Sequence, residues 1–339
     1  MLFFFEVFGR HPQRTIIGDG SRHVSQVYGF YIAFTVFSGL SALGSSSDSS
    51  GRGGSIHLSG SVQDVLIVSC LFNNCQAKAC GGAIHFYPSI GNFYMIGCCT
   101  NRCFCYGSEA SEGGQNSYIV AGLNKTISIQ YSSFQFSNPA SSDSVTRWFS
   151  SILNYGFQTI NGMNSTKNSI YHTGSTAFNI PSGLNVLYTS ICNNFASNTK
   201  IIQIIGGSDS RMIKNSNIIS NDENCHATIV LWSAPIVTIE NSILLKNTRS
   251  LFYLDQGQLT LKDCYIYHTG TLSNLGIQTP GSVFGSTSTN SLALSHVSTA
   301  YCGADIPLSF DINKYVYSYT IKKTYFYQIL SYIAMMIYA

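Results

Sequence analysis

The stretch Gly53–Leu58 (Gly-Gly-Ser-Ile-His-Leu) recurs 28 residues later as Gly81–Phe86 (Gly-Gly-Ala-Ile-His-Phe). A second feature advances by the same step, because Ile67-x-x-Cys70 returns as Met95-x-x-Cys98. Two features with one shared period indicate a repeated unit of structure, and periods of about 20–50 residues are typical of solenoid proteins. The sequence therefore predicts a repeat fold from residue 53 onward.

The second feature can be followed as a six-residue template: apolar, any, turn-former, Ser or Cys, any, apolar. We place copies at starts 67, 95, 129, 166, 187, 213, 239, 261 and 292. The copies at 213, 239 and 261 agree best, and read Ile-Lys-Asn-Ser-Asn-Ile, Ile-Glu-Asn-Ser-Ile-Leu and Leu-Lys-Asp-Cys-Tyr-Ile. The spacing between copies varies, which predicts loops of variable length between strands.

The third position of the template predicts a corner between two strands. A strand alternates faces with period two, and one residue, Asn241, interrupts that alternation after Ile239. Asn and Asp tolerate the left-handed backbone region, so one such residue lets both flanking strands point inward. The positions that fit this corner are Ser69, Gly97, Asn168, Asn215, Asn241 and Asp263, and those that fit poorly are Tyr131, Thr189 and Leu294. The fourth position then forms a buried column of small residues, namely Cys70, Cys98, Ser132, Ser169, Ser190, Ser216, Ser242, Cys264 and Ser295.

A further apolar strand lies between successive copies. The examples are Ala83–Phe86, Ala177–Ile180, Ile201–Ile205, Ala227–Trp232 and Leu251–Leu254. Each coil therefore has about three short strands, and the predicted fold is all-β, a single-stranded parallel β-helix. We expect an N-terminal segment 1–52 with early strands and a flexible Ser/Gly loop, a β-helix over 53–310, and a C-terminal cap or tail over 311–339.

Composition excludes several classes of protein. Charged residues make up 10% of the chain and the net charge is +3, too little to indicate binding to nucleic acid. A surface made polar by Ser, Thr, Asn and Tyr suits an extracellular location. Two N-glycosylation sequons begin at Asn124 and Asn164; a glycan and a chance match remain equally open.

Eleven cysteines are present, seven of them between residues 70 and 105. Cys70 and Cys98 are 28 residues apart, as are Cys75 and Cys103, so each pair is expected to share a column on adjacent coils. Stacked side chains point in parallel, which favours buried free thiols over disulfides. A metal site is the least favoured alternative, because no Cys-x-x-Cys is present.

Two apolar segments are candidates for contact with a membrane. Val27–Gly44 reads either as a signal anchor or as two early β-strands, and its β-branched and aromatic content favours strands. Tyr325–Ala339 is short for a membrane span, and reads as a solenoid cap or a membrane-associated tail. Membrane association through the termini therefore stays open.

The Gly-Gly-Ala-Ile of Gly81–Ile84 resembles the repeat of polymorphic outer-membrane proteins, whose partner repeat, Phe-x-x-Asn, is approximated by Phe72–Cys75. The chain also resembles β-helix proteins of large surface families in parasitic protists. The resemblance is specific over 53–105 and holds only as a pattern over 106–310. It implies a right-handed parallel β-helix and an adhesin-like surface role, and it supplies no catalytic residues. Residues 311–339 are too few for the membrane barrel of an autotransporter, so that secretion route is not expected.

An enzyme is the alternative, because right-handed β-helices often cleave polysaccharides. Such chemistry needs converging acidic and basic groups, and the nearest cluster is Asp209, Arg211, Asp222, Glu223 and Asp255. Three further sets have a functional and a structural reading: the charges Lys214, Glu240 and Lys262, the pair His57 and His85, and the aromatic pair Trp232 and Tyr253. For the charges and the histidines the structural reading is preferred, while Trp232 and Tyr253 read equally as a sugar-stacking patch or as core.

We therefore expect a non-enzymatic surface or extracellular protein, adhesion-like or structural, with no catalytic residue, cofactor or metal assigned. The alternative is a polysaccharide lyase or glycoside hydrolase on the same scaffold. The candidate partners are a carbohydrate or a cell-surface protein.

Overall fold

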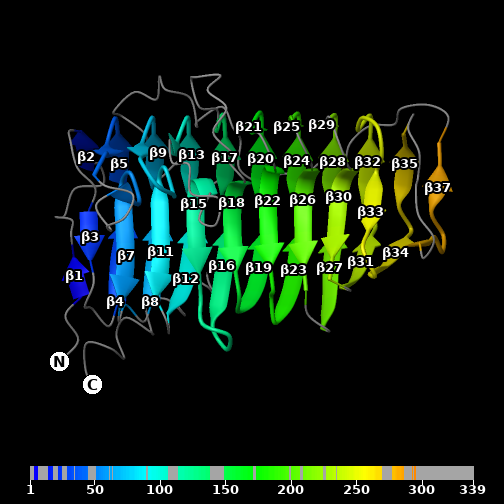
Figure 1. Ribbon diagram of the computed structural model, residues 1–339, viewed down its shortest axis with the longest axis horizontal. Helices are drawn as coiled ribbons and strands as arrows, with labels where there is room; N and C mark the ends of the chain where they lie inside the picture. Colours follow the sequence, from blue (N-terminus) through cyan, green and yellow to red (C-terminus); the bar gives the residue numbers. More distant parts are fainter. Residues whose placement is uncertain are drawn as a thin grey trace.

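The structure is a computed structural model. It describes residues 4–6, 14–17, 22–24, 29–33, 35–44, 51–60, 62, 64–88, 91–105, 114–137, 149–170, 173–197, 200–206, 209–223, 227–233, 235–268, 277–285, 292 and 294. Within these ranges the chain is all-β and forms no α-helix. Its strands stack side by side along the longest axis of the molecule (Figure 1).

Three long parallel sheets dominate the described part of the chain, in which neighbouring strands pair in parallel. Sheet A contains β1 (Phe4–Glu6), β4 (Gly29–Ala33), β8 (Asp64–Val68), β12 (Asn92–Ile96), β16 (Thr126–Gln130), β19 (Phe157–Asn161), β23 (Gly183–Leu187), β27 (Ser210–Lys214), β31 (Ile236–Glu240), β34 (Gln258–Lys262) and β36 (Ile277–Gln278). Sheet B contains β2 (Arg14–Ile17), β5 (Thr35–Ser38), β9 (Leu71–Asn73), β13 (Cys99–Asn101), β17 (Ser133–Gln135), β20 (Asn164–Thr166), β24 (Ser190–Cys192), β28 (Asn217–Ile219), β32 (Ile243–Leu245), β35 (Tyr265–Tyr267) and β37 (Val283–Phe284).

Sheet C contains β3 (Arg22–Val24), β7 (Ile56–Gly60), β11 (Ile84–Pro88), β15 (Gly114–Val120), β18 (Phe149–Asn154), β22 (Thr173–Asn179), β26 (Lys200–Ile205), β30 (Ala227–Trp232) and β33 (Phe252–Leu254). Two short sheets lie between sheets B and C in chain order: β6 (Ser41–Ala42), β10 (Gln76–Ala77) and β14 (Phe104–Cys105), then β21 (Ser169–Ile170), β25 (Phe195–Ala196) and β29 (Asp222–Glu223).

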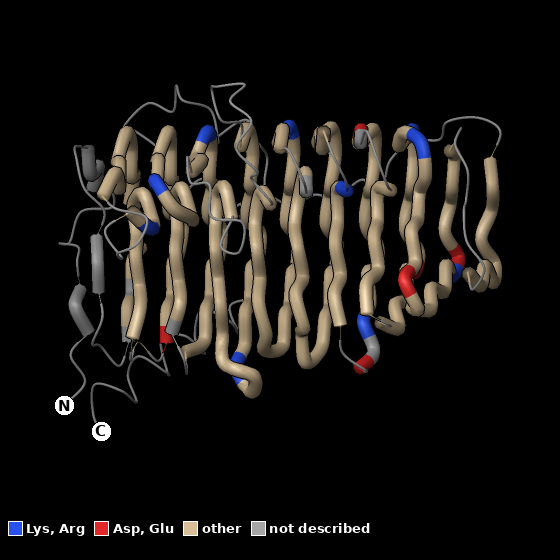
Figure 2. Tube along the Cα trace, in the orientation of Figure 1, with Lys and Arg blue, Asp and Glu red and all other residues tan. Residues whose placement is uncertain are grey.

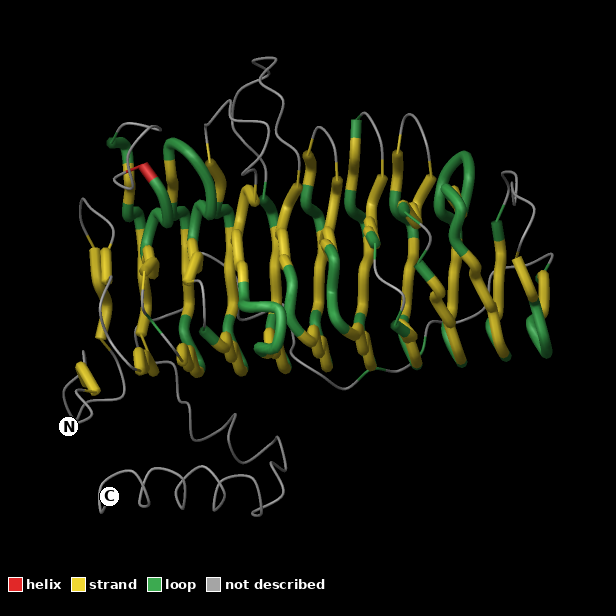
Figure 3. The backbone as a smooth tube through the Cα atoms, turned by 60° about the horizontal axis from the view of Figure 1, so that its bottom comes forward, coloured by secondary structure: helices red, strands yellow, loops and turns green. Residues whose placement is uncertain are grey.

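The chain visits sheets A, B and C in rotation, so neighbours within a sheet come from successive turns of the chain. Figure 3 shows the same strands with loops and turns between them. This architecture is compatible with the predicted β-helix. The apolar segments expected between template copies all lie on sheet C, and Ala227–Trp232 coincides with β30.

Single left-handed residues form the corners, as the template predicts. Between sheets A and B the backbone φ is +49° at Ser69, +47° at Asn241 and +52° at Asp263. Tyr131 also adopts this conformation, with φ +49°, although its side chain fits the position poorly. A second set of left-handed corners follows sheet B, where Asn193 is one member with φ +56°. Each corner redirects the chain while keeping apolar side chains on the inside.

The predicted small-residue column exists where the template is clearest. The N–H of Cys70 lies 3.4 Å from Sγ of Cys98, which is 28 residues later, and the N–H of Ser216 donates to Oγ of Ser242 at 3.1 Å. These contacts put equivalent residues on adjacent turns. The Cys264 N–H in turn donates to Oγ of Ser282 at 3.1 Å. Ser282, rather than the predicted Ser295, continues the column, and Ser295 lies outside the described residues.

Two further copies of the template were placed wrongly. In the copy predicted at 166, the left-handed corner is Gly162, with φ +71°, and Met163 is the buried column residue. In the copy predicted at 187, the corner is Tyr188, with φ +50°. Ser169 and Ser190 are accordingly half-buried strand residues outside the column. Both errors have one cause: the true column residues, Met163 and Thr189, are not the Ser or Cys of the template, whereas Ser169 and Ser190 nearby match it.

A buried ladder of asparagines lines the second corner, and the template did not predict it. Nδ2 of Asn194 donates to Oδ1 of Asn221 at 3.1 Å and to the Ser165 carbonyl at 3.0 Å. The N–H of Asn194 donates to the same Asn221 oxygen at 3.1 Å. The same pattern joins Asn168 to Asn194 and Asn221 to Asn247. Asn168 is thus a buried ladder residue and not a left-handed corner; its neighbour Lys167, with φ +55°, is the corner.

The segment before residue 53 supplies strands to the same sheets. β4, β5 and β6 pair with β8, β9 and β10, and they lie within the apolar segment Val27–Gly44, as the favoured strand interpretation predicts. The described residues contain no helix with the length and apolar character that crossing a membrane requires. Tyr325–Ala339 and the whole of 311–339 lie outside the described residues.

Candidate functional site

The outer face of sheet C presents two parallel rows of side chains. Ile84 and Phe86 of β11 point into the core, so His85 and Tyr87 point outward. The β11–β15 register, continued by one residue, places Val120 beside Tyr87, and Cα partners extend the row through Asn154, Asn179 and Ile205 to Trp232. The register places Tyr118, Ile152, Ala177, Gln203 and Val230 in the row beside it, which contains His85. Each row runs across the strands, with one residue per strand.

A groove of about 300 Å³ lies along these rows. It is lined by Tyr87, Tyr118, Val120, Asn154, Tyr155, Asn179, Ile180 and Ile205. The lining consists of aromatic, amide and aliphatic side chains and contains no charged residue. Such a lining can offer ring faces and amide hydrogen-bonding groups to a polar, uncharged ligand surface.

Tyrosines and a histidine form one end of the groove. The rings of His85 and Tyr118 are stacked with centroids 5.3 Å apart and an interplanar angle of 9°. The Tyr87 ring lies 6.2 Å from that of Tyr118 and is half exposed, with 51% of its surface accessible. Tyr87 is therefore available to a ligand, while Tyr118 and His85 support it from below.

Asn179 lines the middle of the groove, and Gln203 lies in the row beside it, outside the groove lining. Asn179 lies beside Asn154 on the adjacent strand, and its Oδ1 is buried without a hydrogen-bond partner among the described residues. Oε1 of Gln203 is also buried without a hydrogen-bond partner among the described residues, and the Gln203 side chain is only 2% exposed. Buried polar atoms are nearly always paired, so the Asn179 acceptor, on a side chain that lines the groove, suits a ligand that donates hydrogen bonds.

The rim of the groove is fixed by left-handed corners between sheets C and A. Tyr155 has φ +58° and Ile180 has φ +46°, and both side chains are exposed. Gln158, buried inside the solenoid, donates from Nε2 to the carbonyls of Leu153 and Tyr155, both at 3.0 Å. This amide holds the corner that presents Tyr155 to the groove.

A lysine and a tryptophan lie at the other end of the Tyr87 row. Nζ of Lys200 is 4.4 Å from the centroid of the Trp232 ring. The Lys200 side chain is only 4% exposed, and burial lowers the pKa of its ammonium group to about 8. A cation held over a tryptophan face is electrostatically favourable.

The acidic cluster expected for an enzyme is not assembled in the described residues. Asp209 precedes β27 of sheet A, Asp222 lies on β29 between sheets B and C, and Asp255 follows β33 of sheet C. The Asp222 carboxylate accepts a hydrogen bond from Thr248. Charged residues are sparse along the body of the solenoid (Figure 2).

Arg211, the basic member of that cluster, is fully buried. Its guanidinium donates to the carbonyls of Asp209 and Pro181 at 3.2 and 3.3 Å. Burial lowers the pKa of Arg211, and the nearby Asp209 charge partly opposes this effect. Glu223 belongs to β29, but its side chain lies outside the described set.

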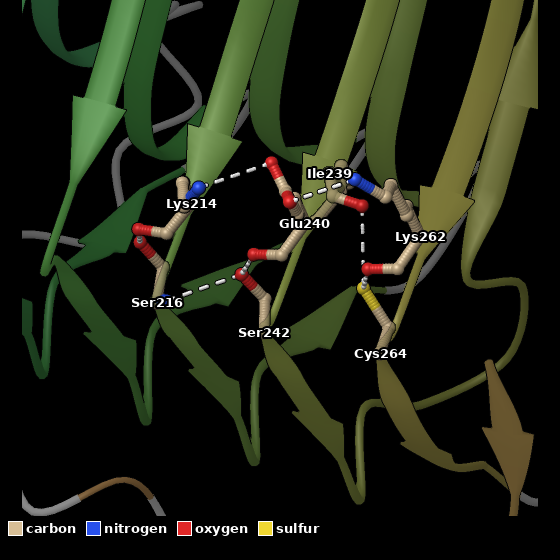
Figure 4. A network of polar contacts seen from close by, with 7 residues as sticks. All are labelled: Lys214, Ser216, Ile239, Glu240, Ser242, Lys262 and Cys264. Atoms are coloured by element: carbon tan, nitrogen blue, oxygen red, sulfur yellow. Dashed lines mark hydrogen bonds and ion pairs between the residues drawn. The ribbon is translucent and has the colours of Figure 1, made fainter. Parts of the chain in front are cut away.

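The charges Lys214, Glu240 and Lys262 form a ladder across three strands of sheet A (Figure 4). Nζ of Lys214 is 3.2 Å from one Glu240 carboxylate oxygen, and Nζ of Lys262 is 3.1 Å from the other. Hydrogen bonds from Lys262 and then Lys214 lower the pKa of Glu240. This arrangement is the stacked ladder that the structural reading predicts.

His57 and His85 occupy equivalent positions, as the period predicts. They are Cα partners, and their rings meet edge to face at 4.7 Å. Both are buried. No group of three or more His, Cys, Asp or Glu suited to a metal occurs among the described residues.

Eight of the described cysteines are not disulfide-bonded, as the stacking argument favours: Cys70, Cys75, Cys80, Cys98, Cys103, Cys105, Cys192 and Cys264. Burial raises the pKa of the Cys70 and Cys103 thiols. Cys99 is the exception, because it is disulfide-bonded. Its side chain lies on the outer face of β13, opposite the core residue Thr100.

Trp232 and Tyr253 lie on the outer face of adjacent strands of sheet C, each 38% exposed. Both side chains therefore match the exposed-patch alternative and not the core alternative. Trp232 is also the last residue of the Tyr87 row. Asn124 of the first sequon is exposed in the turn between β15 and β16, whereas Asn164 lies half-buried on β20.

Sequence reasoning missed Tyr87, Tyr118, Asn154, Asn179, Lys200 and Gln203. The signal that could have found them is the equivalence of strand ends on sheet C. Register shifts in the β15–β18, β18–β22 and β22–β26 pairs obscure that equivalence in the sequence.

Comparisons of the chain with protein-family models, with curated proteins and with solved structures find no match.

Proposed function

We propose that this chain is a non-enzymatic, adhesion-like protein that binds carbohydrate in the groove on the outer face of sheet C. The observation that carries the proposal is the groove lining, which combines the exposed ring of Tyr87 with the amides of Asn154 and Asn179, the latter having an unpaired oxygen. Sugar hydroxyls donate hydrogen bonds, and sugar rings present apolar faces to aromatic side chains. A surface of amides and exposed rings therefore matches both properties of a glycan.

The proposal includes the finer form of the fold: a right-handed β-helix with three strands per coil. Its support is the general rule that crossovers between parallel strands of one sheet are right-handed in about 98% of cases, together with the resemblance to Gly-Gly-Ala-Ile surface proteins. In such a solenoid the groove runs along the helix axis. A row from Tyr87 to Trp232 then spans five strand spacings, or roughly 24 Å, which is long enough for several linked sugars.

The proposed location is the cell surface or the extracellular space. The 10% content of charged residues and the exposed Asn124 sequon support it. Protease treatment of intact cells should therefore degrade the protein, whereas a cytosolic marker stays intact. Protection of this chain to the same degree as the marker would contradict the location and leave the glycan-binding proposal to its own test.

The decisive experiment is a glycan-array screen of the full chain, followed by calorimetric titration of the best glycan. Asn179→Ala and Tyr87→Ala should each weaken binding about three- to tenfold, because each removes one hydrogen-bonding or ring contact. The matched controls are Asn185→Ala on the outer face of sheet A and Tyr188→Ala at its exposed corner with sheet B.

Unchanged affinity in both groove variants, or equal losses in the controls, would place the glycan elsewhere on the molecule. Failure to bind any glycan would overturn the proposal. Chain shortening of a bound glycan would instead favour the hydrolase or lyase alternative, and the products should be analysed by mass spectrometry.

A further inference from the structure

Lys200 is a buried cation for which the described residues provide no carboxylate. Its side chain is 4% exposed, and the ion pairs found among the described residues involve Lys214 and Lys262. Burying a charge without an opposite charge is costly. The cation–π contact with Trp232 offsets only part of that cost, so an anion at this position would be bound favourably.

The position of Lys200 relates it to the groove. It begins β26, the strand that also carries Gln203 and Ile205. The partner of Ile205 on the next strand is Trp232, whose ring contacts the Lys200 ammonium. The cation, the unpaired Gln203 amide and the groove lining therefore belong to neighbouring positions on one sheet face.

Charge is distributed unevenly along this face. The residues that line the groove are uncharged, and Lys200 adds a positive charge at the Trp232 end. A ligand with one sugar at each position would meet rings at the Tyr87 end, amides in the middle, and a cation with an indole ring at the other end. Such a site selects for charge at one position and fixes the direction of the bound chain.

We propose that the groove binds an acidic glycan, with a carboxylate or sulfate ester of one sugar at Lys200 and the ring of that sugar against Trp232. The proposal rests on the function proposed above and names the chemical class of its ligand. Carboxylate and sulfate share the chemistry that recognises Lys200, and the experiment distinguishes them.

The test compares matched glycans that differ only in charge. Chondroitin oligosaccharides carry carboxylates, their sulfated forms carry both groups, and their carboxyl-reduced forms carry neither. The array used above extends the comparison to other neutral, uronate-containing and sulfated chains. Binding to the full-length protein should favour anionic members about tenfold or more, and this preference should weaken as salt increases.

The variant Lys200→Met keeps the length and apolar stem of the side chain and removes its charge. It should lose about tenfold in affinity for the anionic glycans and remain unchanged for neutral ones. The control is Lys167→Met, because Lys167 also lies over an aromatic ring, 5.2 Å from the Phe136 centroid, but is exposed and lies outside the groove. Circular dichroism establishes that each variant is folded, and Trp232→Phe provides a second variant of the same subsite.

The outcomes separate the two proposals. Equal binding of neutral and anionic glycans, or an unchanged preference in both Lys200→Met and Trp232→Phe, would overturn the acidic-glycan inference and leave glycan binding intact. Binding to the sulfated members alone would assign a sulfate ester, and binding to every carboxylated member a uronate. Absence of binding to any glycan would overturn the proposed function and this inference together.

Discussion

Individual residues at the corners show how much the fold depends on backbone conformation. The left-handed region is costly for most residues and least so for Gly, Asn and Asp. Asn215, Asn241 and Asp263 meet this requirement, whereas Tyr131 and Tyr188 occupy it at greater cost. The parallel pairing of the flanking strands determines where a left-handed corner lies, and the residue type determines how much free energy that conformation costs.

Asn241 allows a direct test of that cost. Its side chain is exposed and its φ is +47°, so Asn241→Val should destabilise the fold by about 1–2 kcal/mol, because a β-branched residue is strained there. Asn241→Gly should have little effect. The control is Thr238→Val on β31. The measurement is the urea midpoint followed by circular dichroism, and equal stability of the Val and Gly variants would contradict the argument.

Lys200 should give the stability of the protein a distinct pH dependence. Burial lowers its pKa from the ordinary value of 10.5 to about 8, so between these values the unfolded chain binds more protons than the folded one. Stability therefore rises with pH over that interval, and the full penalty for burying the charge applies below about pH 8. The shift corresponds to about 3 kcal/mol.

Lys200→Met should remove this contribution and be more stable than the parent at pH 7, with the difference declining towards pH 10.5. Urea midpoints at pH 7, 8, 9 and 10 measure it, and Lys167→Met serves as the exposed control. A constant difference between the parent and Lys200→Met across the range would show that Lys200 is not the titrating group.

At the scale of elements, side-chain ladders connect one coil to the next. The asparagine ladder at the second corner pairs Oδ1 and Nδ2 of each member with a neighbour or a backbone group. The Lys214–Glu240–Lys262 ladder connects adjacent coils through ion pairs on the outer face of sheet A. The first is buried and the second is partly exposed, so removal of a member should have very different consequences.

Asn194→Ala should destabilise the protein by about 3 kcal/mol. The substitution leaves buried groups of Asn168, Asn221 and Ser165 without their partner, and each unpaired buried group costs about 1–3 kcal/mol. Asn185→Ala on the surface of β23 should change stability by less than about 0.5 kcal/mol. Thermal unfolding compares the two, and similar shifts in Tm would contradict a special role for the ladder.

Glu240→Gln should cause only a small loss of stability, and one that depends on salt. Because Lys262 and Lys214 lower the pKa of Glu240, the ladder contributes above the ordinary pKa of a glutamate and is lost as pH falls through the lowered value. The difference between parent and variant should therefore disappear both in acid and in 1 M NaCl. A difference that persists under both conditions would indicate a packing effect.

At the scale of the whole molecule, each coil contacts mainly its neighbours in the stack. In a solenoid of this kind, stability approximates a sum of unit and nearest-neighbour terms. The apolar interior is nevertheless continuous from Phe30 to Ile266, so a defect in one coil should be felt most by the coils on either side.

Phe178→Ala tests this local behaviour. Phe178 is buried in the core and pairs with Leu153 and Ile204 on adjacent strands, so its truncation should cost about 3–5 kcal/mol. Amide hydrogen exchange should increase most in β18, β22 and β26. Phe37→Ala, with its stacked partner Phe72, should shift the effect to β5 and β9. Uniform loss of protection in both variants would indicate a single cooperative unit instead.

Much of the fold could be predicted because the pattern is local. The 28-residue step from Gly53–Leu58 to Gly81–Phe86 equals the register between β7 and β11. The copies at 213, 239 and 261 lie in one column. The copies at 166 and 187 failed because Met163 and Thr189 occupy the column position for which the template requires Ser or Cys. The asparagine ladder recurs in the sequence as Asn168, Asn194, Asn221 and Asn247, but the template includes only Asn168, at the wrong position.

The sequence by itself determined the all-β class, the corners and the buried small-residue column, since these follow from alternation, left-handed tolerance and a short period. Only the tertiary structure brought Tyr87, Asn179, Gln203 and Lys200 to one face. These residues are separated by loops of unequal length and by register shifts. Their proximity results from stacking of whole coils, which places residues side by side according to strand register rather than distance along the chain.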